Sequence, residues 1–400
     1  MTWPAYPRYR DSRVDWLGDV PDSWAVTQLR HVCKVSTGDK DTINRVDDGE
    51  YPFFIRSEEI QRINSWSLDC EAVLTPGDGA VGKVFHHYVG KFDFHQRVYA
   101  FYDFRMVLGR YFFYYLSGLF AAVALDGSAK TTVDSLRMPL IKGFQLTFPS
   151  SGTDQREIVE FLDRETAKID ALIGKQERLI ATLQERRGAV ADQLLNPPGL
   201  ILPLKRIVAD VTVGIVVTPS AWYADEGVPA LRGLNIRPGL VTSEDLVYLT
   251  PEGDALHAKS RLCAGDVVMV RTGQAGSAAV IPNQLSGANA IDLLIIRPGA
   301  KADPDFLAAY FNAPSTREKI AHGSVGAIQG HFNVSALREL EFPSIDIAEQ
   351  RRRAEHWSIQ ACNIDALIEK TETFIELSRE YRSALITDVV TGKIDVRGAA

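Results

Sequence analysis

The sequence lacks the features that would mark a membrane, secreted or metal-binding protein. No run of eighteen apolar residues occurs in the 400-residue chain, so no membrane span is expected. The four cysteines are scattered without a C-x-x-C pair, which argues against a disulfide or zinc framework. The opening residues, Met1-Thr2-Trp3-Pro4, lack the apolar core of a signal peptide. We therefore expect a cytoplasmic protein with free thiols.

An excess of positive charge is also missing. The formal net charge is −7, which at first argues against a nucleic-acid partner. However, residues 1–150 carry 17 basic and 18 acidic groups, and residues 201–340 carry 12 and 13. Both regions are nearly neutral, which leaves room for a local basic groove in each, although composition alone does not show one.

Intact nucleotide and cofactor motifs are absent as well. The segment from Gly77 to Val84 nearly matches the phosphate-binding G-x-x-x-x-G-K-[ST], but Val84 replaces the hydroxyl that ligates magnesium, and no helix pattern follows. Asn196-Pro197-Pro198-Gly199 is similar to the N-P-P-[YF] motif of adenine methyltransferases, with Gly199 in place of the stacking aromatic ring. We interpret the first as a loop and the second as a helix stop. No catalytic residue, cofactor or metal site is predicted.

What the sequence does contain is an internal repeat. Residues 155–189 and 350–384, offset by 195, are identical at 14 of 35 positions. Weaker similarity lies upstream, where Leu29-Arg30 resembles Leu204-Lys205 and residues 146–150 resemble 340–344. The chain is therefore predicted to run domain, helix, domain, helix, and the two domains share a frame but differ in their loops.

Both copies of the repeat are typical of long helices. Asp154 with Glu157 and Asp346 with Glu349 predict capping boxes at the two starts. Asn196-Pro197-Pro198-Gly199 and Thr391-Gly392 predict the two ends. Apolar residues at heptad-like spacing predict that the helices pack on each other. These residues are Leu162, Ile169, Leu172, Leu179, Leu183 and Val190 in the first copy, and Trp357, Ile364, Leu367, Phe374 and Leu385 in the second.

The two domains are expected to mix strands and helices. β-like runs occur at 98–102, 267–270 and 293–296, and an aromatic helix is expected in each domain, near 109–120 and 304–312. The predicted fold class is α+β. Two mixed α/β domains are joined by two long helices that form an antiparallel coiled coil, with an internal pseudo-two-fold repeat.

An ordered set of segments resembles the specificity subunit of type I restriction–modification systems. The set comprises the opening segment from Tyr9 to Trp24, the Phe-Pro followed by Gln155-Arg156-Glu157 and again by Gln350-Arg351-Arg352, and the closing segment from Val390 to Val396. The resemblance implies a first target recognition domain at 1–150, a spacer helix at 151–199, a second recognition domain at 200–343, and a second spacer helix with the C-terminal tail at 344–400.

The resemblance also implies function and partners. A specificity subunit is not itself an enzyme and has no cofactor. It binds a bipartite target in double-stranded DNA and positions two modification (methyltransferase) subunits and the restriction (endonuclease/translocase) subunits. The match lies in the helices and the frame, so the target sequence cannot be carried over from the family.

Candidate DNA contacts lie in polar, Gly-containing loops. Arg can pair with guanine, and Asn or Gln with adenine, whereas Lys, Ser and Thr more often hold phosphate. The candidates in the first domain are Arg56, Ser57, Lys83, His86, His87, Lys91, Lys130, Thr131 and Thr132, and those in the second are Arg232, Asn235, Arg271, Thr272, Gln274, Gln329, His331 and Asn333.

Two other classes of function stay open at this point. A self-contained methyltransferase or ATPase would need the loops that are defective here. A coiled-coil adaptor that binds only protein, without reading DNA sequence, fits the acidic balance but does not explain two large domains with divergent Gly-rich loops.

Overall fold

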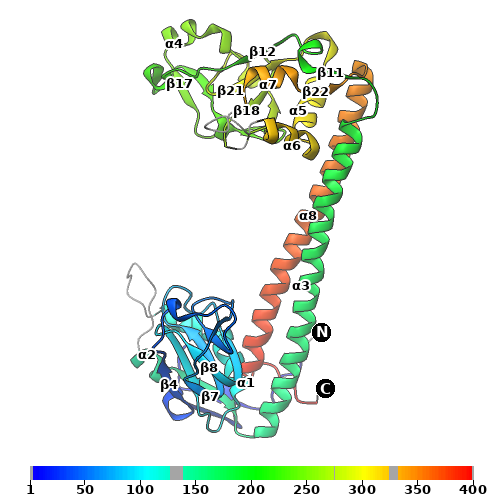
Figure 1. Cartoon of the computed structure of the whole chain (residues 1–400). Helices are drawn as coiled ribbons and strands as arrows, with labels where there is room; N and C mark the ends of the chain where they lie inside the picture. The colour runs from blue at the N-terminus through cyan, green and yellow to red at the C-terminus, as the bar shows by residue number, and fades with distance from the viewer. Residues whose placement is uncertain (1–2, 127–137, 274, 324–331, 399–400) are drawn as a thin grey trace. The chain divides into compact units, whose positions relative to one another are not determined.

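The computed structural model describes residues 3–126, 138–273, 275–323 and 332–398, and the chain separates into two compact units (Figure 1). Unit 1 comprises Met1–Gln176 with Thr373–Ala400, and unit 2 comprises Glu177–Glu372. The division falls within both long helices. Among the described residues, no helix is both long and apolar enough to cross a membrane.

Unit 1 is built on a six-stranded sheet with the strand order β4-β9-β7-β8-β5-β6. Neighbouring strands are antiparallel except β5 and β8, which run parallel. The strands are β4 (Lys34–Thr37), β5 (Tyr51–Phe54), β6 (Gln61–Ile63), β7 (Leu68–Pro76), β8 (His86–Phe94) and β9 (Val98–Tyr102). Helix α1 (Gly109–Asp126) packs on β7 and β8, and its aromatic side chains form much of the buried core.

Short elements complete unit 1. They are β1 (Tyr9–Asp11) paired with β2 (Asp19–Pro21), β3 (Trp24–Gln28) paired with β10 (Gln145–Pro149), the 3-10 turns η1 (Leu29–His31) and η2 (Thr42–Asn44), and α2 (Met138–Gly143).

Unit 2 contains a four-stranded antiparallel sheet with the order β12-β21-β18-β19. Its strands are β12 (Asp210–Val213), β18 (Val267–Val270), β19 (Ala278–Val280) and β21 (Leu293–Arg297). A second sheet has the order β13-β17-β14-β20, from β13 (Tyr223–Ala224), β14 (Val228–Leu231), β17 (Val247–Leu249) and β20 (Asn289–Ala290). Two-stranded pairs join β15 (Ile236–Arg237) to β16 (Leu240–Val241) and β11 (Ile201–Pro203) to β22 (Glu341–Pro343).

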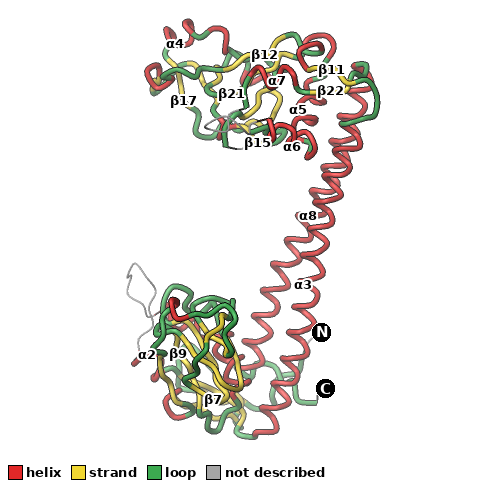
Figure 2. The backbone as a smooth tube through the Cα atoms, in the orientation of Figure 1, coloured by secondary structure: helices red, strands yellow, loops and turns green. Residues whose placement is uncertain are grey.

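The helices of unit 2 are mostly short. They are α4 (Pro251–Leu256), α5 (Pro304–Asn312), α6 (Pro314–Gly323) and α7 (Val334–Glu339), with 3-10 turns η3 (Leu204–Arg206), η4 (Pro219–Trp222), η5 (Gly233–Asn235), η6 (Ala258–Ser260), η7 (Asn283–Leu285) and η8 (Gly299–Lys301). Figure 2 shows strands gathered in the globular part of each unit, away from the two long helices.

The two units share one topology. Four strands of unit 1 follow one another in the chain as β4, β7, β8 and β9, and across the sheet they lie as first, fourth, second and third. The strands β12, β18, β19 and β21 of unit 2 have the same arrangement across their sheet. Each unit also has a parallel pair: β5 joins β8 within the six-stranded sheet, and β14 pairs with β20 in the second sheet of unit 2. The expected runs at 98–102, 267–270 and 293–296 are strands, and the two aromatic helices lie where predicted. The predicted fold class and internal repeat are confirmed.

A buried glutamine anchors the same junction in each unit. Gln155 Oε1 accepts the Leu108 N–H at 2.8 Å, and its Nε2 donates to the Met106 carbonyl at 2.8 Å. At the offset of 195, Gln350 Oε1 accepts the Asp303 N–H at 2.9 Å and its Nε2 donates to the Lys301 carbonyl at 2.9 Å. Each glutamine therefore joins the first turn of a long helix to the segment that enters α1 or α5.

The long helices are α3 (Gly152–Leu195) and α8 (Ile347–Val390). Their ends agree with the predicted stop signals. The cap predicted at Asp346 is present, because its Oδ1 accepts the Glu349 N–H at 2.8 Å. The cap predicted at Asp154 is wrong. The helix begins earlier, the Ser151 hydroxyl accepts the Asp154 N–H at 3.3 Å, and the Asp154 carboxylate instead pairs with Arg397 at 3.0 Å.

Repeat-related ion pairs link the antiparallel helices within each unit. In unit 2, Arg187 pairs with Asp365 at 2.7 Å, and in unit 1, Arg382 pairs with Asp170 at 2.8 Å. The offset of 195 relates the two arginines and the two aspartates, so the same pair forms once in each unit. All four side chains are partly exposed, so each pair contributes about 1 kcal/mol or less.

The predicted apolar stripe is only partly correct. Leu162, Leu183, Ile364 and Leu385 are buried, but Leu172, Leu179, Leu367 and Phe374 are 39 to 51% exposed. The two buried residues of each copy are three heptads apart and form one row, whereas the exposed residues lie three positions on in the heptad, so this second row of the stripe faces solvent. The offset of 195 pairs these exposed residues as Leu172 with Leu367 and Leu179 with Phe374.

Candidate nucleic-acid interface

In unit 1, the turn after β5 meets the loop between β7 and β8. His86 Nε2 lies 3.0 Å from the Ser57 carbonyl, and Arg56 pairs with Asp78 at 3.1 Å. Arg97, in the turn before β9, pairs with the same carboxylate at 2.8 Å. Burial alone would raise the pKa of Asp78, but hydrogen bonds from Arg97 and Arg56 outweigh it and hold that pKa below its usual value. The two guanidinium groups remain about half exposed around one carboxylate, so the cluster is locally positive.

Lys83 lies in the same loop between β7 and β8. The loop turns at Gly79 (φ +74°) and Gly82 (φ +70°), conformations that glycine adopts without strain. Lys83 is exposed, and the loop leads into strand β8 rather than into a helix. The local structure is therefore a β-loop that presents a lysine, and it lacks the strand-to-helix form of a nucleotide-binding loop.

The other two candidates on β8 lie apart from this cluster. His87 is largely buried, with its Nε2 at 2.8 Å from Glu71 Oε1 and its ring against Phe113 of α1. Its side chain is therefore held in structural contacts. Lys91 is exposed, and its ammonium group lies 4.9 Å from the centre of the Trp66 ring.

In unit 2, Arg271 and Thr272 follow strand β18 and share one partner. Arg271 Nη1 lies 3.2 Å from Asp292 Oδ1, and the Thr272 hydroxyl donates to Asp292 Oδ2 at 3.1 Å. Asp292 adopts a left-handed backbone conformation (φ +52°), which turns its carboxylate toward this loop. The pair is only partly exposed, so the guanidinium is pre-positioned at the end of the sheet.

The turn after β14 lies beside these residues. Arg232 donates from Nη2 to the Asp245 carbonyl at 2.7 Å. Asn235 accepts the Arg232 N–H at 2.9 Å and donates to the Glu244 carbonyl at 2.7 Å. Asn235 is fully buried with both ends of its amide engaged, so it shapes the turn and does not reach solvent. A hollow of about 350 Å³ has this turn on one side and Thr272 on the other.

The remaining candidates divide between a helix cap and segments outside the described residues. Asn333 is exposed, and its Oδ1 accepts the Ala336 N–H at 2.9 Å as the N-cap of α7. The preceding Phe332 donates its N–H to the Arg271 carbonyl at 3.2 Å, which places Asn333 near the Arg271 loop. Lys130, Thr131, Thr132, Gln274, Gln329 and His331 lie outside the described residues.

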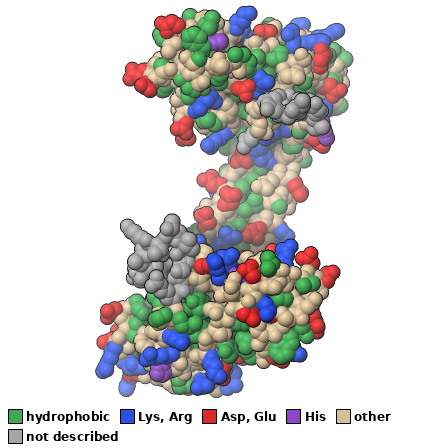
Figure 3. All heavy atoms as spheres, turned by 60° about the vertical axis from the view of Figure 1, so that its left-hand side comes forward, with side chains coloured by type: hydrophobic (Ala, Val, Ile, Leu, Met, Phe, Trp, Pro, Cys, Tyr) green, Lys and Arg blue, Asp and Glu red, His purple; other side chains and the backbone are tan. Residues whose placement is uncertain are grey.

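The candidates gather at equivalent places in the two units. In unit 1 the turn after β5 faces the β7–β8 loop, and in unit 2 the turn after β14 faces the β18–β19 loop. Each cluster therefore combines the turn after one strand with the loop of a neighbouring hairpin, although β14 belongs to a different sheet from β18 and β19. Figure 3 shows basic and acidic side chains interspersed on the face drawn, in agreement with the net charge of −7.

Two residues that contact the candidates or their partners were missed from the sequence. Arg97 completes the pair of guanidinium groups on Asp78, and its position in a short turn between two strands is the signal that could have identified it. Trp66 is 46% exposed and is flanked by Ser65 and Ser67, whose hydroxyls both bind the buried Asp93 carboxylate. An aromatic residue between two serines in a loop is a weaker signal.

Comparison with known families finds a match in the first part of the chain. Residues 21–180 match the family model described as the type I restriction modification DNA specificity domain. The match covers two-fifths of the chain, and this part is therefore similar to a type I DNA specificity domain. The domain covers most of unit 1, including the Arg56, Asp78 and Lys83 cluster. The resemblance to type I specificity subunits is thereby confirmed.

Curated relatives are described as specificity subunits of type I restriction enzymes. The chain is 30% identical over 179 residues to the EcoDI specificity subunit of a type I restriction enzyme from Escherichia coli, a match that covers 45% of this chain and 39% of the relative. It is 20% identical over 179 residues to the StySPI specificity subunit from Salmonella potsdam, covering 43% and 38%. These matches cover less than two-fifths of either relative.

Solved structures extend the likeness in fold to nearly the whole chain. A structure from a study of complex assembly and conformational transition of the type I R-M system has a TM-score of 0.68 and 14% identity, and the match covers 94% of this chain and 99% of that one. The HsdS subunit from Thermoanaerobacter tengcongensis has a TM-score of 0.52 and 12% identity, with 94% and 98% covered. The fold is shared across both units and beyond the specificity domain.

Proposed function

We propose that the chain is the DNA sequence-specificity subunit of a type I restriction–modification complex. It binds a bipartite target in double-stranded DNA through two recognition domains, residues 1–150 and 200–343. Residues 151–199 and 344–400 supply the two spacer helices. The chain itself is not an enzyme, and its place of action is the cytoplasm.

One observation carries this proposal. The specificity domain in unit 1 and its repeat in unit 2 each present a cluster with basic side chains held by a carboxylate, while the loops that bear them differ. A conserved frame with divergent loops is the arrangement expected when two domains read different base sequences. Guanidinium groups held by carboxylates, as at Arg56 and Arg271, are pre-oriented to bind guanine edges or phosphates.

We propose that the partners are two modification (methyltransferase) subunits and, for cleavage, restriction (endonuclease/translocase) subunits. The helices support a protein partner, because Leu172, Leu179, Leu367 and Phe374 leave apolar surface exposed at repeat-related positions on both. Exposed apolar surface on a helix is typical of a face that a partner covers. We infer no bound cofactor for this chain.

The test is a mobility-shift and methylation assay. The purified chain, alone and with its modification subunits, is offered a pool of duplexes with two randomised half-sites and a variable spacer. We expect selection of one bipartite sequence, and adenine methylation only when modification subunits and S-adenosylmethionine are present. Methyl transfer by the chain alone would contradict the proposal. Tight binding of modification subunits with no sequence selection would instead identify a coiled-coil adaptor.

A further inference from the structure

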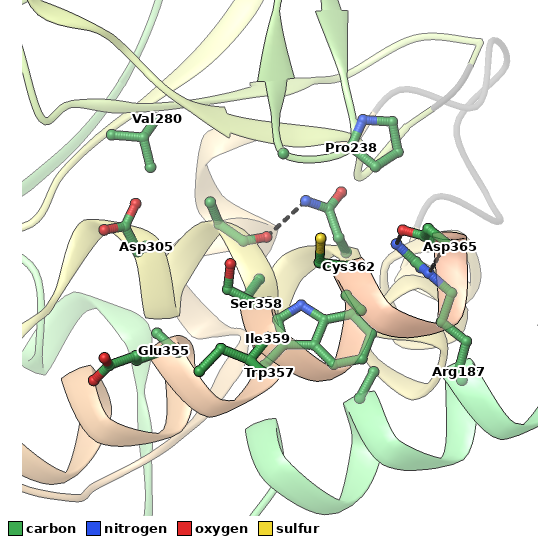
Figure 4. A pocket seen from close by; sticks show the side chains of 18 of the residues that line it. Arg187, Pro238, Val280, Asp305, Glu355, Trp357, Ser358, Ile359, Cys362 and Asp365 are labelled. Carbon is green, nitrogen blue, oxygen red and sulfur yellow. Dashed lines mark hydrogen bonds and ion pairs between the residues drawn. The ribbon is translucent and has the colours of Figure 1, made fainter. Parts of the chain in front are cut away.

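A groove of about 1040 Å³ runs between α5 and α8 in unit 2 (Figure 4). Asp305 and Ala309 line it from α5, and Ser358 and Ala361 from α8. Figure 4 shows Asp305 on one side of this space and Ser358, Trp357 and Ile359 on the other. The groove is large enough for several side chains, and small side chains occupy four of its positions, Asp305 and Ala309 on α5 and Ser358 and Ala361 on α8.

Unit 1 shows what fills the equivalent space there. At the offset of 195, fixed by the Gln155 and Gln350 anchors, the four positions are Arg110, Tyr114, Asp163 and Thr166. Arg110 Nε donates to Asp163 Oδ1 at 2.9 Å, and the Tyr114 hydroxyl donates to the same oxygen at 2.6 Å. The Tyr114 hydroxyl also lies 3.2 Å from the Thr166 hydroxyl. An arginine, a tyrosine ring and a carboxylate therefore close the seam between α1 and α3.

Each of these interactions is absent from unit 2, because every member has changed. Alanines replace Tyr114 and Thr166, Ser358 replaces the carboxylate of Asp163, and Asp305 replaces the guanidinium of Arg110. No described residue forms an ion pair or hydrogen bond with Asp305. Surrounding protein raises the pKa of the Asp305 carboxyl, and the nearby Asp303 raises it further. The contact between α5 and α8 thus lacks the tyrosine ring and the arginine cation of unit 1, and it has gained the carboxylate of Asp305.

We infer that the α5–α8 groove is a docking site for a modification subunit, which inserts a cationic side chain beside an aromatic one. The cation pairs with Asp305, and the ring packs in the space over Ala309 and Ala361. This inference rests on the proposed function for the identity of the partner. The lining holds four carboxylates and three guanidinium groups, and Arg351 pairs with Asp303 and Arg187 with Asp365. Asp305 and Glu355 are left against Arg317 alone, so the remaining charge favours a cationic protein side chain over a phosphate backbone.

Two exposed thiols in unit 2 give a direct test without mutation. Cys362 lines the groove, whereas Cys263 is exposed and does not line it. The rate of alkylation by iodoacetamide is followed at both residues by mass spectrometry, with and without the modification subunit. We expect the modification subunit to slow labelling of Cys362 at least about fivefold and to leave Cys263 unchanged, since only the covered thiol loses access to reagent. Unchanged labelling of Cys362 in a complex shown to have formed would overturn the inference.

Variants test the occupant's chemistry. Asp305→Lys reverses one exposed charge and is expected to weaken binding of the modification subunit about tenfold or more, because like charges then meet. Glu226→Lys makes the same charge change at an exposed site outside the groove and serves as the control. The transplant D305R/A309Y/S358D/A361T recreates the unit 1 seam. It is expected to fill the groove, keep the circular dichroism spectrum and lower the number of bound modification subunits.

The outcomes separate the two proposals. If the wild-type chain binds no modification subunit, the proposed function fails and this inference fails with it. If wild type and both groove variants bind equally well, only the groove assignment is wrong. Protection of Cys362 in the chain alone as its concentration rises would show that a second copy occupies the groove, and this result would also overturn the inference.

Discussion

Single side chains in the two candidate clusters differ in the contacts that fix them, and this difference predicts their roles. Lys83 is exposed on a glycine-turned loop, and we propose that it meets phosphate. Arg271 is fixed against Asp292 at the end of β18 in an orientation that can face a base edge. A flexible cation suits non-specific attraction, whereas a fixed guanidinium suits recognition of one geometry.

Lys83→Ala is expected to weaken DNA binding by the assembled complex to a similar extent on all target sequences. Its loss should also reduce the slope of log Kd against log salt by about 1, because one phosphate contact releases one counterion. Lys175→Ala removes the same charge from an exposed position on α3 and is the control. A loss confined to one base position would show that Lys83 reads sequence.

Arg271→Ala is expected to relax the preference at one base pair of one half-site, at a cost of about 1–3 kcal/mol on the preferred base. Asp292→Asn should produce a smaller change at the same base pair, because it loosens the guanidinium without removing it. Binding to the full set of single-base-pair variants of the selected target measures both effects. A uniform loss on every duplex would assign Arg271 to phosphate instead.

Among the secondary-structure elements, the paired glutamines have the clearest consequence. Gln155 and Gln350 are buried and each bridges three backbone groups, the third being the carbonyl of Pro149 at 2.8 Å and of Ile345 at 3.0 Å. Gln155→Ala and Gln350→Ala are each expected to lower the free energy of unfolding by about 3 kcal/mol, because buried backbone groups lose their partners.

Urea titration followed by circular dichroism measures this loss. Gln184→Ala, at an exposed position on α3, is the matched control and is expected to change stability by less than about 0.5 kcal/mol. Because each glutamine lies in a different unit, the two substitutions should destabilise separate parts of the chain. Equal effects of Gln184→Ala and Gln155→Ala would mean that the anchors contribute no more than helix propensity.

The helices were predictable from sequence because their signals are local. The repeat, the cap at Asp346 and the stops after Leu195 and Val390 all lie within a few residues of the features they specify. The error at Asp154 arose because Ser151, three residues earlier, offers a competing acceptor and Arg397, distant in sequence, takes the carboxylate. Strand order depends on pairings between distant segments, such as β4 with β9, which no local pattern encodes.

The candidate sites were predictable in location but not in the state of each residue. Polar Gly-containing loops led to Arg56 and Arg271, yet Asn235 and His87 proved to be engaged in structural contacts. Burial depends on how loops fold against each other. The groove escaped the sequence analysis because its alanines carry no signal alone; only a comparison with Arg110 and Tyr114 at the offset of 195 reveals what is missing.

For the whole molecule, the repeat together with the proposed function predicts that the two halves of the target are read independently. Each candidate cluster lies within one unit and is held by contacts inside that unit, such as Arg56 with Asp78 and Arg271 with Asp292. Substitutions at separate sites that share no partner usually have additive effects. A change in one cluster should therefore alter one half-site and leave the base preferences of the other unchanged.

The variants R56A, R271A and the double variant R56A/R271A test this independence. Each is assembled with modification subunits and used to select duplexes from a pool with two randomised half-sites and the wild-type spacer. We expect R56A to relax the first half-site only, R271A to relax the second only, and the double variant to relax both, with free-energy changes that add within about 0.5 kcal/mol. If R56A altered preferences in both half-sites, the two units would be reading the DNA as one coupled surface, and the assignment of one recognition domain to each half-site would be wrong.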